Sequence, residues 1–497
     1  MRRLFRCAAV GLTLGLLGAP ALLAQTAPPA WQAAITTVRV TTQANVPDVH
    51  CAAAKPKPPV AAVVDPDPPQ VPDEEEVLRQ LAAWKHSPVT APLERVEGAP
   101  WWPVRAGEPL RMGIWGDSHL AAGFFTAELA RLSALPAEQI KSRFIPANMG
   151  RAGVRLPLRK SCVDAAWRYE PGHAVAAGAE APGPGLVNLF SQQAGARLTW
   201  DLRNAAAQPD KRQIRLLYQQ TASPMVLAIR VDEGPERLVT LQAAPGPAVL
   251  ELVGDAPLSV LQLKLVEGAL RLHGMEWPLP ADTRLQLDVF GYPGATVAGW
   301  KAVAADPLRA WWGPAPYDVV ALAFGTNEGN VQPFDANAYG QLLKASVAAW
   351  RAQFPSAQCV LIAPGDRGVL VRRSLAQSAA PASAKPSLKS SGKSGKGSRK
   401  PRPSDKAVST PAAADVLRFT RVHEDIGRLQ RQVAADHGCR FWSAMEAMNG
   451  AGGAYRWARQ NPPLMARDLI HFTVPGYQRL AQLFAQDMGW SSALFAP

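Results

Sequence analysis

Two apolar segments of this chain each run directly into a glycine-containing turn that carries a chemically reactive type of side chain. Residues 110–115 lead into Gly116-Asp117-Ser118, and residues 319–324 lead into Gly325-Thr326-Asn327. Short apolar runs of this kind alternate with helical stretches, which is typical of an α/β protein with a doubly wound parallel sheet. The side chains that follow such strands gather at the carboxyl edge of the sheet. The five predicted strands are residues 110–115, 285–290, 319–324, 359–363 and 440–442.

The segment between the first and second of these strands has a different texture. From residue 186 to 277, short runs of alternating apolar and polar residues are separated by Gly, Pro and Asp turns. Period-two strands at such short spacing predict a β-sandwich inserted into the α/β domain. The predicted organisation is a signal peptide at 1–24, a Pro/Ala-rich linker at 25–72, an α/β domain in three parts at 73–160, 285–373 and 416–497, an inserted β-sandwich at 161–284, and a basic low-complexity insertion at 374–415.

The N-terminus has the pattern of a secretion signal. Arg2, Arg3 and Arg6 precede an apolar run at 8–17, and small residues follow at 19–24. The apolar run is too short to favour a membrane span, although a retained N-terminal anchor is the alternative. We therefore expect an exported protein of the periplasm or cell envelope, with no transmembrane segment after signal cleavage.

The net charge of +13 is concentrated in one stretch. Residues 385–406 hold eight lysines and arginines against a single acid, Asp405, and so carry +7. Electrostatic contact of this stretch with an anionic wall polymer or membrane surface is one reading, and a solvated, disordered insertion is the one we favour. Nucleic-acid binding is disfavoured, because no aromatic residue interleaves these charges.

Four cysteines follow the predicted signal: Cys51, Cys162, Cys359 and Cys439. No pair has the spacing of metal ligands, so a structural zinc site is not expected. Cys359 and Cys439 each precede an apolar run, and the two sulfurs could meet in a disulfide if these runs are neighbouring strands. Two free buried thiols are the alternative.

Four side chains far apart in the sequence supply the parts of an acyl-transfer site. Ser118 is a nucleophile, His471 a base, Asp468 an orienting carboxylate, and the amide of Asn327 a donor to an oxyanion. Each has an ordinary alternative as a helix cap, a turn residue or a histidine at the edge of the core. Their order along the chain, after predicted strands or in a loop, favours the catalytic reading.

These motifs resemble those of the SGNH/GDSL hydrolase superfamily. Gly116-Asp117-Ser118 matches the first motif, Gly294 the second, Gly325-Thr326-Asn327 the third and Asp468-Leu469-Ile470-His471 the last. The resemblance covers roughly residues 110–160, 285–370 and 415–490, and it implies a flavodoxin-like sheet and a serine esterase without a metal or organic cofactor.

In this resemblance Ser118 attacks an ester, His471 takes its proton and Asp468 orients the imidazole. The oxyanion hole would be formed by the Ser118 amide, the Gly294 amide and the Asn327 side chain. Gly150 and Gly153 compete for the second of these positions, but Gly294 is preferred because it follows a predicted strand.

Two residues depart from the family pattern. Glu328 stands where the third motif usually carries aspartate, and His119 stands where many members carry leucine. Neither departure touches the predicted proton transfer. His119 would be a poor base, because it is adjacent to Ser118 on a tight turn.

The β-rich insertion resembles the carbohydrate-binding-module-like sandwich of exported peptidoglycan O-acetylesterases. This implies removal of O-acetyl groups from a cell-wall glycan, with 6-O-acetyl-muramoyl residues as the expected substrate. A polysaccharide O-acetyltransferase with the same triad and a non-catalytic glycan-binding protein are the alternatives. Four aromatic residues are candidates for glycan stacking, of which at least half are expected in the core: Trp167, Tyr169, Trp200 and Tyr218.

Overall fold

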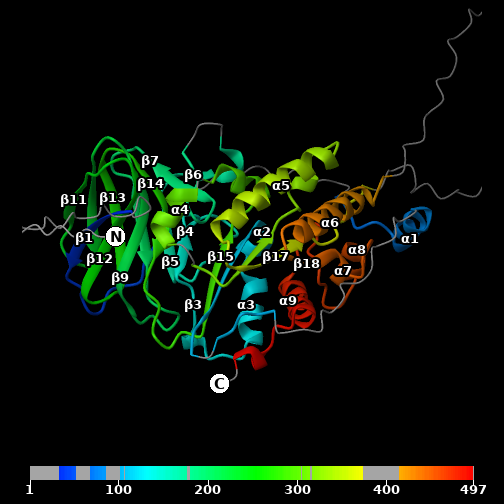
Figure 1. Ribbon diagram of the computed structural model, residues 1–497, viewed down its shortest axis with the longest axis horizontal. Helices are drawn as coiled ribbons and strands as arrows, with labels where there is room; N and C mark the ends of the chain where they lie inside the picture. Colours follow the sequence, from blue (N-terminus) through cyan, green and yellow to red (C-terminus); the bar gives the residue numbers. More distant parts are fainter. Residues whose placement is uncertain are drawn as a thin grey trace, which may run out of the picture.

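The computed structural model describes residues 33–51, 68–84, 101–105, 107–175, 180–303, 305–313, 316–372 and 414–495. The predicted signal peptide and the basic stretch at 385–406 lie outside these residues. Two mostly antiparallel sheets occupy one end of the molecule, and a parallel sheet flanked by helices occupies the other (Figure 1). Within the described ranges, no helix has the length and apolar character needed to cross a membrane.

A six-stranded parallel sheet forms the α/β part, in the order β18-β17-β16-β2-β15-β3. Five of its strands fall on the five apolar runs of the sequence. The expected total of five is one short, because β3 at the edge has two residues and is too short to produce a sequence pattern. The strands are β2 (Leu110–Gly116), β3 (Ile140–Lys141), β15 (Leu285–Gly291), β16 (Val319–Ala323), β17 (Gln358–Ala363) and β18 (Arg440–Ser443).

Helices cover both faces of this sheet. Successive residues of a strand point to opposite faces, so each strand contributes side chains to the core on either side. On β2, Met112 and Ile114 enter the core shared with α3 and α9, whereas Trp115 enters the core shared with α5 and α6. A helix on each face explains why the central strands read as continuous apolar runs. The helices are α1 (Glu74–Ala83), α2 (Ser118–Ala121), α3 (Phe124–Leu132), α4 (Ala305–Trp312), α5 (Ala336–Gln353), α6 (Arg418–Asp436), α7 (Ala444–Ala447), α8 (Gly453–Ala458) and α9 (Val474–Met488).

The other two sheets contain seven and five strands and share one apolar core. The seven-stranded sheet is also buried on its outer face: Leu217 and Val249 join the core of the α/β part, and Trp311 Nε1 of α4 donates to the Ala248 carbonyl at 3.2 Å. The seven strands are β1 (Ala34–Val40), β4 (Phe144–Pro146), β6 (Arg168–Pro171), β7 (Val187–Ser191), β9 (Lys211–Gln220), β12 (Gly246–Leu258) and β14 (Leu270–Glu276). The five are β5 (Lys160–Val163), β8 (Arg197–Asp201), β10 (Met225–Val231), β11 (Arg237–Leu241) and β13 (Val260–Glu267).

The prediction of a linker over residues 25–72 is wrong for its described middle part. Ala34–Val40 forms β1, which pairs in parallel with β12 at the edge of the seven-stranded sheet. This run has five β-branched residues and neither proline nor glycine, a strand signal that the proline-rich surroundings obscure. Further along the same segment, Cys51 forms a disulfide with Cys162 that the sequence did not predict.

The second disulfide joins Cys359 of β17 to Cys439, which directly precedes β18. Of the two alternatives left by the sequence, the structure has the bridge. It forms because β17 and β18 are neighbouring parallel strands, as the apolar runs after the two cysteines indicate.

Helix α1 packs against the α/β part at the end far from β1 (Figure 1). Its Val77 is buried with Leu417, Tyr455 and Leu469, and Gln80 donates through Nε2 to the carbonyl of Ala414 at 2.8 Å. The chain before β2 therefore contacts both ends of the molecule.

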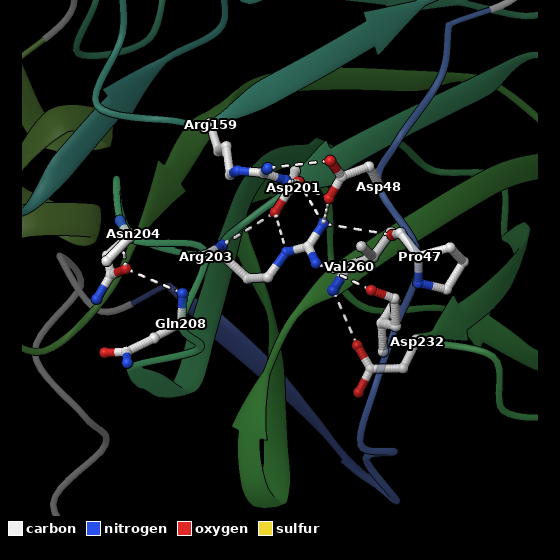
Figure 2. A network of polar contacts seen from close by, with 11 residues as sticks. Pro47, Asp48, Arg159, Asp201, Arg203, Asn204, Gln208, Asp232 and Val260 are labelled. Carbon is white, nitrogen blue, oxygen red and sulfur yellow. Dashed lines mark hydrogen bonds and ion pairs between the residues drawn. The ribbon is translucent and has the colours of Figure 1, made fainter.

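A network of ion pairs fixes residues 46–48 to the five-stranded sheet (Figure 2). Asp201, with a fully buried side chain, accepts from Arg203 Nη2 at 2.7 Å and from Arg159 Nη1 at 2.9 Å. Both arginines also reach Asp48, and Arg203 Nη1 donates to the Val46 carbonyl at 2.9 Å. Burial opposes ionisation of Asp201, but the arginine hydrogen bonds outweigh it and hold its pKa below the ordinary value.

Replacement of Asp201 by asparagine should destabilise the protein by about 3–5 kcal/mol, because two guanidinium groups lose their buried counter-charge. The measurement is urea unfolding at pH 7. Since the pKa of Asp201 is lowered in the folded state, the effect is present at neutral pH and shrinks as the pH falls through the acidic range below about 4.

The matched control is Asp210→Asn, which removes an exposed carboxylate paired only with Lys211 and should change stability by no more than about 0.5 kcal/mol. Equal unfolding midpoints for the two variants would show that the buried network does not stabilise the segment.

Candidate active site

The sequence motifs meet at the carboxyl edge of the parallel sheet. The register places Gly116, at the end of β2, beside Gly291 of β15 and Ala323 of β16. The turns after these three neighbouring strands carry Ser118, Gly294 and Asn327, respectively. The loop before α9 brings Asp468 and His471 to the same edge, so the structure assembles all five predicted residues in one region.

Ser118, His471 and Asp468 form a hydrogen-bonded chain. Ser118 Oγ lies 3.0 Å from His471 Nε2, and His471 Nδ1 lies 2.8 Å from Asp468 Oδ2. These are the contacts that a hydroxyl nucleophile, its base and an orienting carboxylate require.

The local fold explains the three-residue spacing of Asp468 and His471. Asp468 Oδ1 accepts from the backbone amides of Ile470 and His471, both at 2.9 Å, so the carboxylate closes its own turn. Between them Leu469 has a φ of 55°, and its fully buried side chain packs in the cluster around Tyr455. The anchored leucine holds the turn in place and leaves both polar side chains at the surface.

Hydrogen bonds keep Asp468 ionised. Partial burial pushes its pKa upward, but the imidazole and amide of His471 and the amide of Ile470 outweigh burial, and the pKa is lower than that of an ordinary aspartate. The carboxylate is therefore negative at neutral pH and can stabilise an imidazolium at His471.

His119 is beside this chain but does not belong to it. Its ring centre lies 5.3 Å from that of His471, and its Nδ1 lies 3.2 Å from the Tyr477 hydroxyl. Burial, followed by the charge of His471, lowers the pKa of His119 to about 3. A histidine with so low a pKa is a weak base at neutral pH, in keeping with the poor base expected from its position.

Asn327 and Gly294 are adjacent in space. Asn327 Nδ2 donates to the carbonyl of Ala295 at 2.9 Å and makes a longer contact of 3.4 Å to Asp117 Oδ2. Gly294 has a φ of 86°, and no atom lies within 4 Å of the place that a Cβ would occupy. Of the two competing glycines, Gly150 is crowded, because a Cβ there would lie 2.8 Å from the Val163 side chain. At Gly153 a Cβ would lie 4.0 Å from Pro293.

Two buried carboxyl groups lie beneath these turns. Glu328 accepts from the Val297 amide through Oε1 at 2.8 Å and from the Gly325 amide through Oε2 at 3.0 Å. Burial raises its pKa to about 7, and burial likewise raises the pKa of Asp117 to about 6. In the sequence Glu328 is only a departure from the third motif; in the structure it joins the turn that contains Gly294 to the loop that contains Asn327.

The aromatic candidates for glycan stacking do not form an exposed platform. Trp167, Trp200 and Tyr218 are buried in the core between the two antiparallel sheets. Tyr169 is partly buried, and its hydroxyl donates to the Met149 carbonyl at 2.8 Å. The expectation that at least half of the four candidates lie in the core is therefore confirmed, and Tyr169 alone of the four stays partly exposed.

Comparisons with known proteins found no matching family model and no matching curated protein. Among solved structures, the chain resembles a peptidoglycan O-acetylesterase with a TM-score of 0.49 and 20% identity, over 77% of this chain and 91% of that one. It also resembles a lipase/acylhydrolase from Enterococcus faecalis (TM-score 0.24, 16% identity, 41% of this chain and 77% of that one). A third is a family two carbohydrate esterase from Clostridium thermocellum (TM-score 0.21, 9% identity, 61% of this chain and 95% of that one).

A further neighbour is described as a putative GDSL-like lipase from Parabacteroides merdae (TM-score 0.26, 14% identity, 42% of this chain and 75% of that one). Identities of 20% or less and TM-scores below 0.5 leave the chemistry of this chain to be inferred from its own residues.

Replacement of Glu328 by glutamine should lower kcat on a small acetyl ester by about ten- to a hundredfold, because an amide NH₂ would face one of the two backbone N–H donors and loosen the turns on either side.

A raised pKa in the folded state also means that the stability contributed by Glu328 is full below the ordinary glutamate pKa and is lost as the pH rises through about 7. The fall in melting temperature between pH 5 and pH 8 should be smaller in the variant.

The control is Glu138→Gln, the same chemical change at an exposed position. Parallel pH profiles and equal kcat values for the two variants would exclude a positioning role for Glu328.

Proposed function

We propose that this protein is an exported serine esterase that removes O-acetyl groups from a cell-wall polysaccharide, namely 6-O-acetyl-muramoyl residues of peptidoglycan. The observation that carries the proposal is the chain from Ser118 Oγ through His471 to Asp468 at the carboxyl edge of the sheet. The mechanism follows from the position of each group in this chain.

In the first half-reaction Ser118 Oγ attacks the acetyl carbonyl carbon while His471 Nε2 takes the hydroxyl proton. The tetrahedral intermediate collapses, the bond to the sugar oxygen breaks, and His471 returns its proton to that oxygen. In the second half-reaction His471 takes a proton from water, the resulting hydroxide attacks the acetyl-serine, and acetate leaves as Ser118 regains its proton. Each step uses only water and side chains of this protein.

The oxyanion formed in both halves would be stabilised by the amides of Ser118 and Gly294 and by the side chain of Asn327. The bond from Asn327 to the Ala295 carbonyl fixes the amide plane and leaves its second N–H only a 3.4 Å contact to Asp117. That contact is longer than a usual N–H···O bond, so this second N–H can donate to a substrate oxygen at little cost.

The openness of the site supports a polymeric substrate. The side chains of His471 and Asp468 are 42% and 47% exposed. A triad at the surface can reach an acetyl group on a long glycan strand, whereas an enclosed pocket would admit only a small ester.

The two disulfides support export, since such bridges persist in oxidising compartments such as the periplasm. This agrees with the secretion signal predicted at residues 1–24, which lie outside the described part of the chain.

A polysaccharide O-acetyltransferase is the second candidate, because it would use the same acetyl-serine. The exposed His471 can activate a sugar hydroxyl as well as water. Acetate release in the absence of an acceptor, compared with transfer to an added glycan, separates the two. The complete hydrogen-bonded triad disfavours a protein that only binds glycan.

The deciding experiment measures acetate release from purified O-acetylated peptidoglycan and from acetylated xylan. We expect release from peptidoglycan, and we expect Ser118→Ala to abolish it while keeping the melting temperature of the wild type, because the nucleophile is lost and no core contact changes. Activity retained by Ser118→Ala would refute the catalytic assignment, and release from xylan alone would refute the substrate.

Removal of the Asn327 amide tests the oxyanion hole. Asn327→Ala should lower kcat by on the order of 10²-fold with little change in KM, because the donor acts mainly on the transition state. Asn337→Ala removes an exposed amide on α5 and serves as the control. If Asn327→Ala turns over as fast as this control, Asn327 has no part in oxyanion stabilisation.

A further inference from the structure

Two arginines at the rim of the triad share one aromatic ring. The guanidinium of Arg367 lies 3.9 Å from the ring centre of Phe419, and that of Arg418 lies 4.6 Å from the same centre. Arg367 is partly buried on the loop after β17, and Arg418 is exposed at the start of α6. Stacking on a ring fixes the plane of a guanidinium while its N–H edge stays available to a carboxylate.

Arg367 lies between the loop that contains Asn327 and the turn that contains Asp468 and His471. It contacts the side-chain oxygen of Asn330, three residues after Asn327, and the next residue, Gly368, donates to the Leu469 carbonyl at 3.0 Å. The charge of Asp468 also acts on Arg367, and that of Arg367 on His119. A group held by Arg367 would therefore lie next to a substrate whose acetyl group is at Ser118.

Neither arginine has a carboxylate partner among the residues that the structure describes. The neighbouring Asp366 turns away and accepts from the Ala454 amide at 3.0 Å, and Asp415 pairs with Arg421 instead. Asp468 is engaged by His471 and its own turn. The Nε of Arg367 is buried and has no hydrogen-bond acceptor among the described residues.

On the opposite rim of the site, two further arginines also lie over aromatic rings. Arg155 is exposed and stacks 4.7 Å from the ring centre of Phe124, which in turn stacks on Tyr477 beside His119. Arg151 lies 5.6 Å from the ring centre of Tyr292, two residues before Gly294. In the described part of the chain, no ion pair engages either of them, so positive charge flanks the triad on both sides.

We propose that Arg367 and Arg418, which both stack on Phe419, form a carboxylate-binding subsite that selects acetylated glycans bearing carboxylates over neutral ones. The proposal rests on the proposed esterase function and narrows its substrate class. A glycan with acidic substituents at regular intervals, such as the stem-peptide carboxylates of peptidoglycan, would contact this subsite and the opposite rim while its acetyl ester reaches Ser118. The exposed guanidinium of Arg418 can offer paired N–H donors to such a carboxylate, and Arg367 adds positive charge beside it.

The test compares acidic substrates with neutral ones. Solubilised O-acetylated peptidoglycan is assayed with its carboxylates free and after their conversion to amides, and acetylated pectin is paired with acetylated xylan as an acidic and a neutral polysaccharide. Wild type should prefer each acidic member by about tenfold or more in kcat/KM, as expected for one or two charge-assisted hydrogen bonds. The preference should appear mainly in KM, because the contact is remote from the reacting carbonyl.

Arg418→Gln should reduce the preference for the acidic member by about three- to tenfold, and Arg367→Gln by at least as much, with partial recovery in Arg367→Lys. Arg418 is exposed, so its replacement keeps the test valid even if Arg367→Gln fails to fold. The matched control is Arg212→Gln, the same loss of charge at an exposed position on β9 in the antiparallel part, which should keep the wild-type preference.

Equal rates of wild type on free and amidated peptidoglycan, or loss of preference in Arg212→Gln as large as in Arg418→Gln, would overturn the subsite. Absence of activity on both forms of peptidoglycan would instead refute the proposed substrate. In that case, a preference for acetylated pectin over acetylated xylan that depends on Arg418 would still support the subsite. Absence of that preference would refute the subsite as well.

Discussion

The burial of Trp115 is the interaction on which the arrangement of this molecule depends. Its indole stacks on Phe290 with ring centres 4.6 Å apart and meets four further aromatic rings, those of Trp300, Trp312, Tyr317 and Phe354. Its Nε1 donates to the Pro184 carbonyl at 2.9 Å, on the segment that enters the seven-stranded sheet. Because Trp115 is the third residue before Ser118, the same packing that joins the parallel and antiparallel parts also fixes where the nucleophile stands.

The site combines an ionised carboxylate at the surface with titratable groups beneath it whose pKa values are shifted by burial. Asp468 is partly exposed and ionised, whereas His119 has a depressed pKa and Asp117 and Glu328 have raised ones because they are buried. Burial thus keeps His119 neutral and moves the titration of Asp117 and Glu328 to about pH 6 and about pH 7. Glu328 can then act through geometry, by holding two backbone turns, more than through charge.

The sequence was informative wherever a local pattern determined the structure. The apolar runs predicted five of the six parallel strands, and the residues after them predicted which side chains meet at the edge. The strand β3 is set only by pairing with β15, and β1 was hidden by the prolines around it. The bond between Cys51 and Cys162 and the clamp made by Glu328 depend on contacts across more than one element, which no spacing in the sequence reveals. Burial of Trp167 and Trp200 likewise follows from the packing of two sheets.

The pairing of β1 has a consequence for the order in which the protein can be completed. Residue Ala34 lies opposite Ala248, and α1 contacts Ala414 and the residues around it. During synthesis or export, β1 and α1 must therefore wait for partners that are made more than 200 and more than 300 residues later, respectively. Contacts of such long range close slowly, since the entropy of a large loop is lost before they form. Strand β1 and helix α1 leave the ribosome before the other described elements and are among the last to find their partners, so a chaperone that shields them meanwhile would speed maturation without altering the finished enzyme.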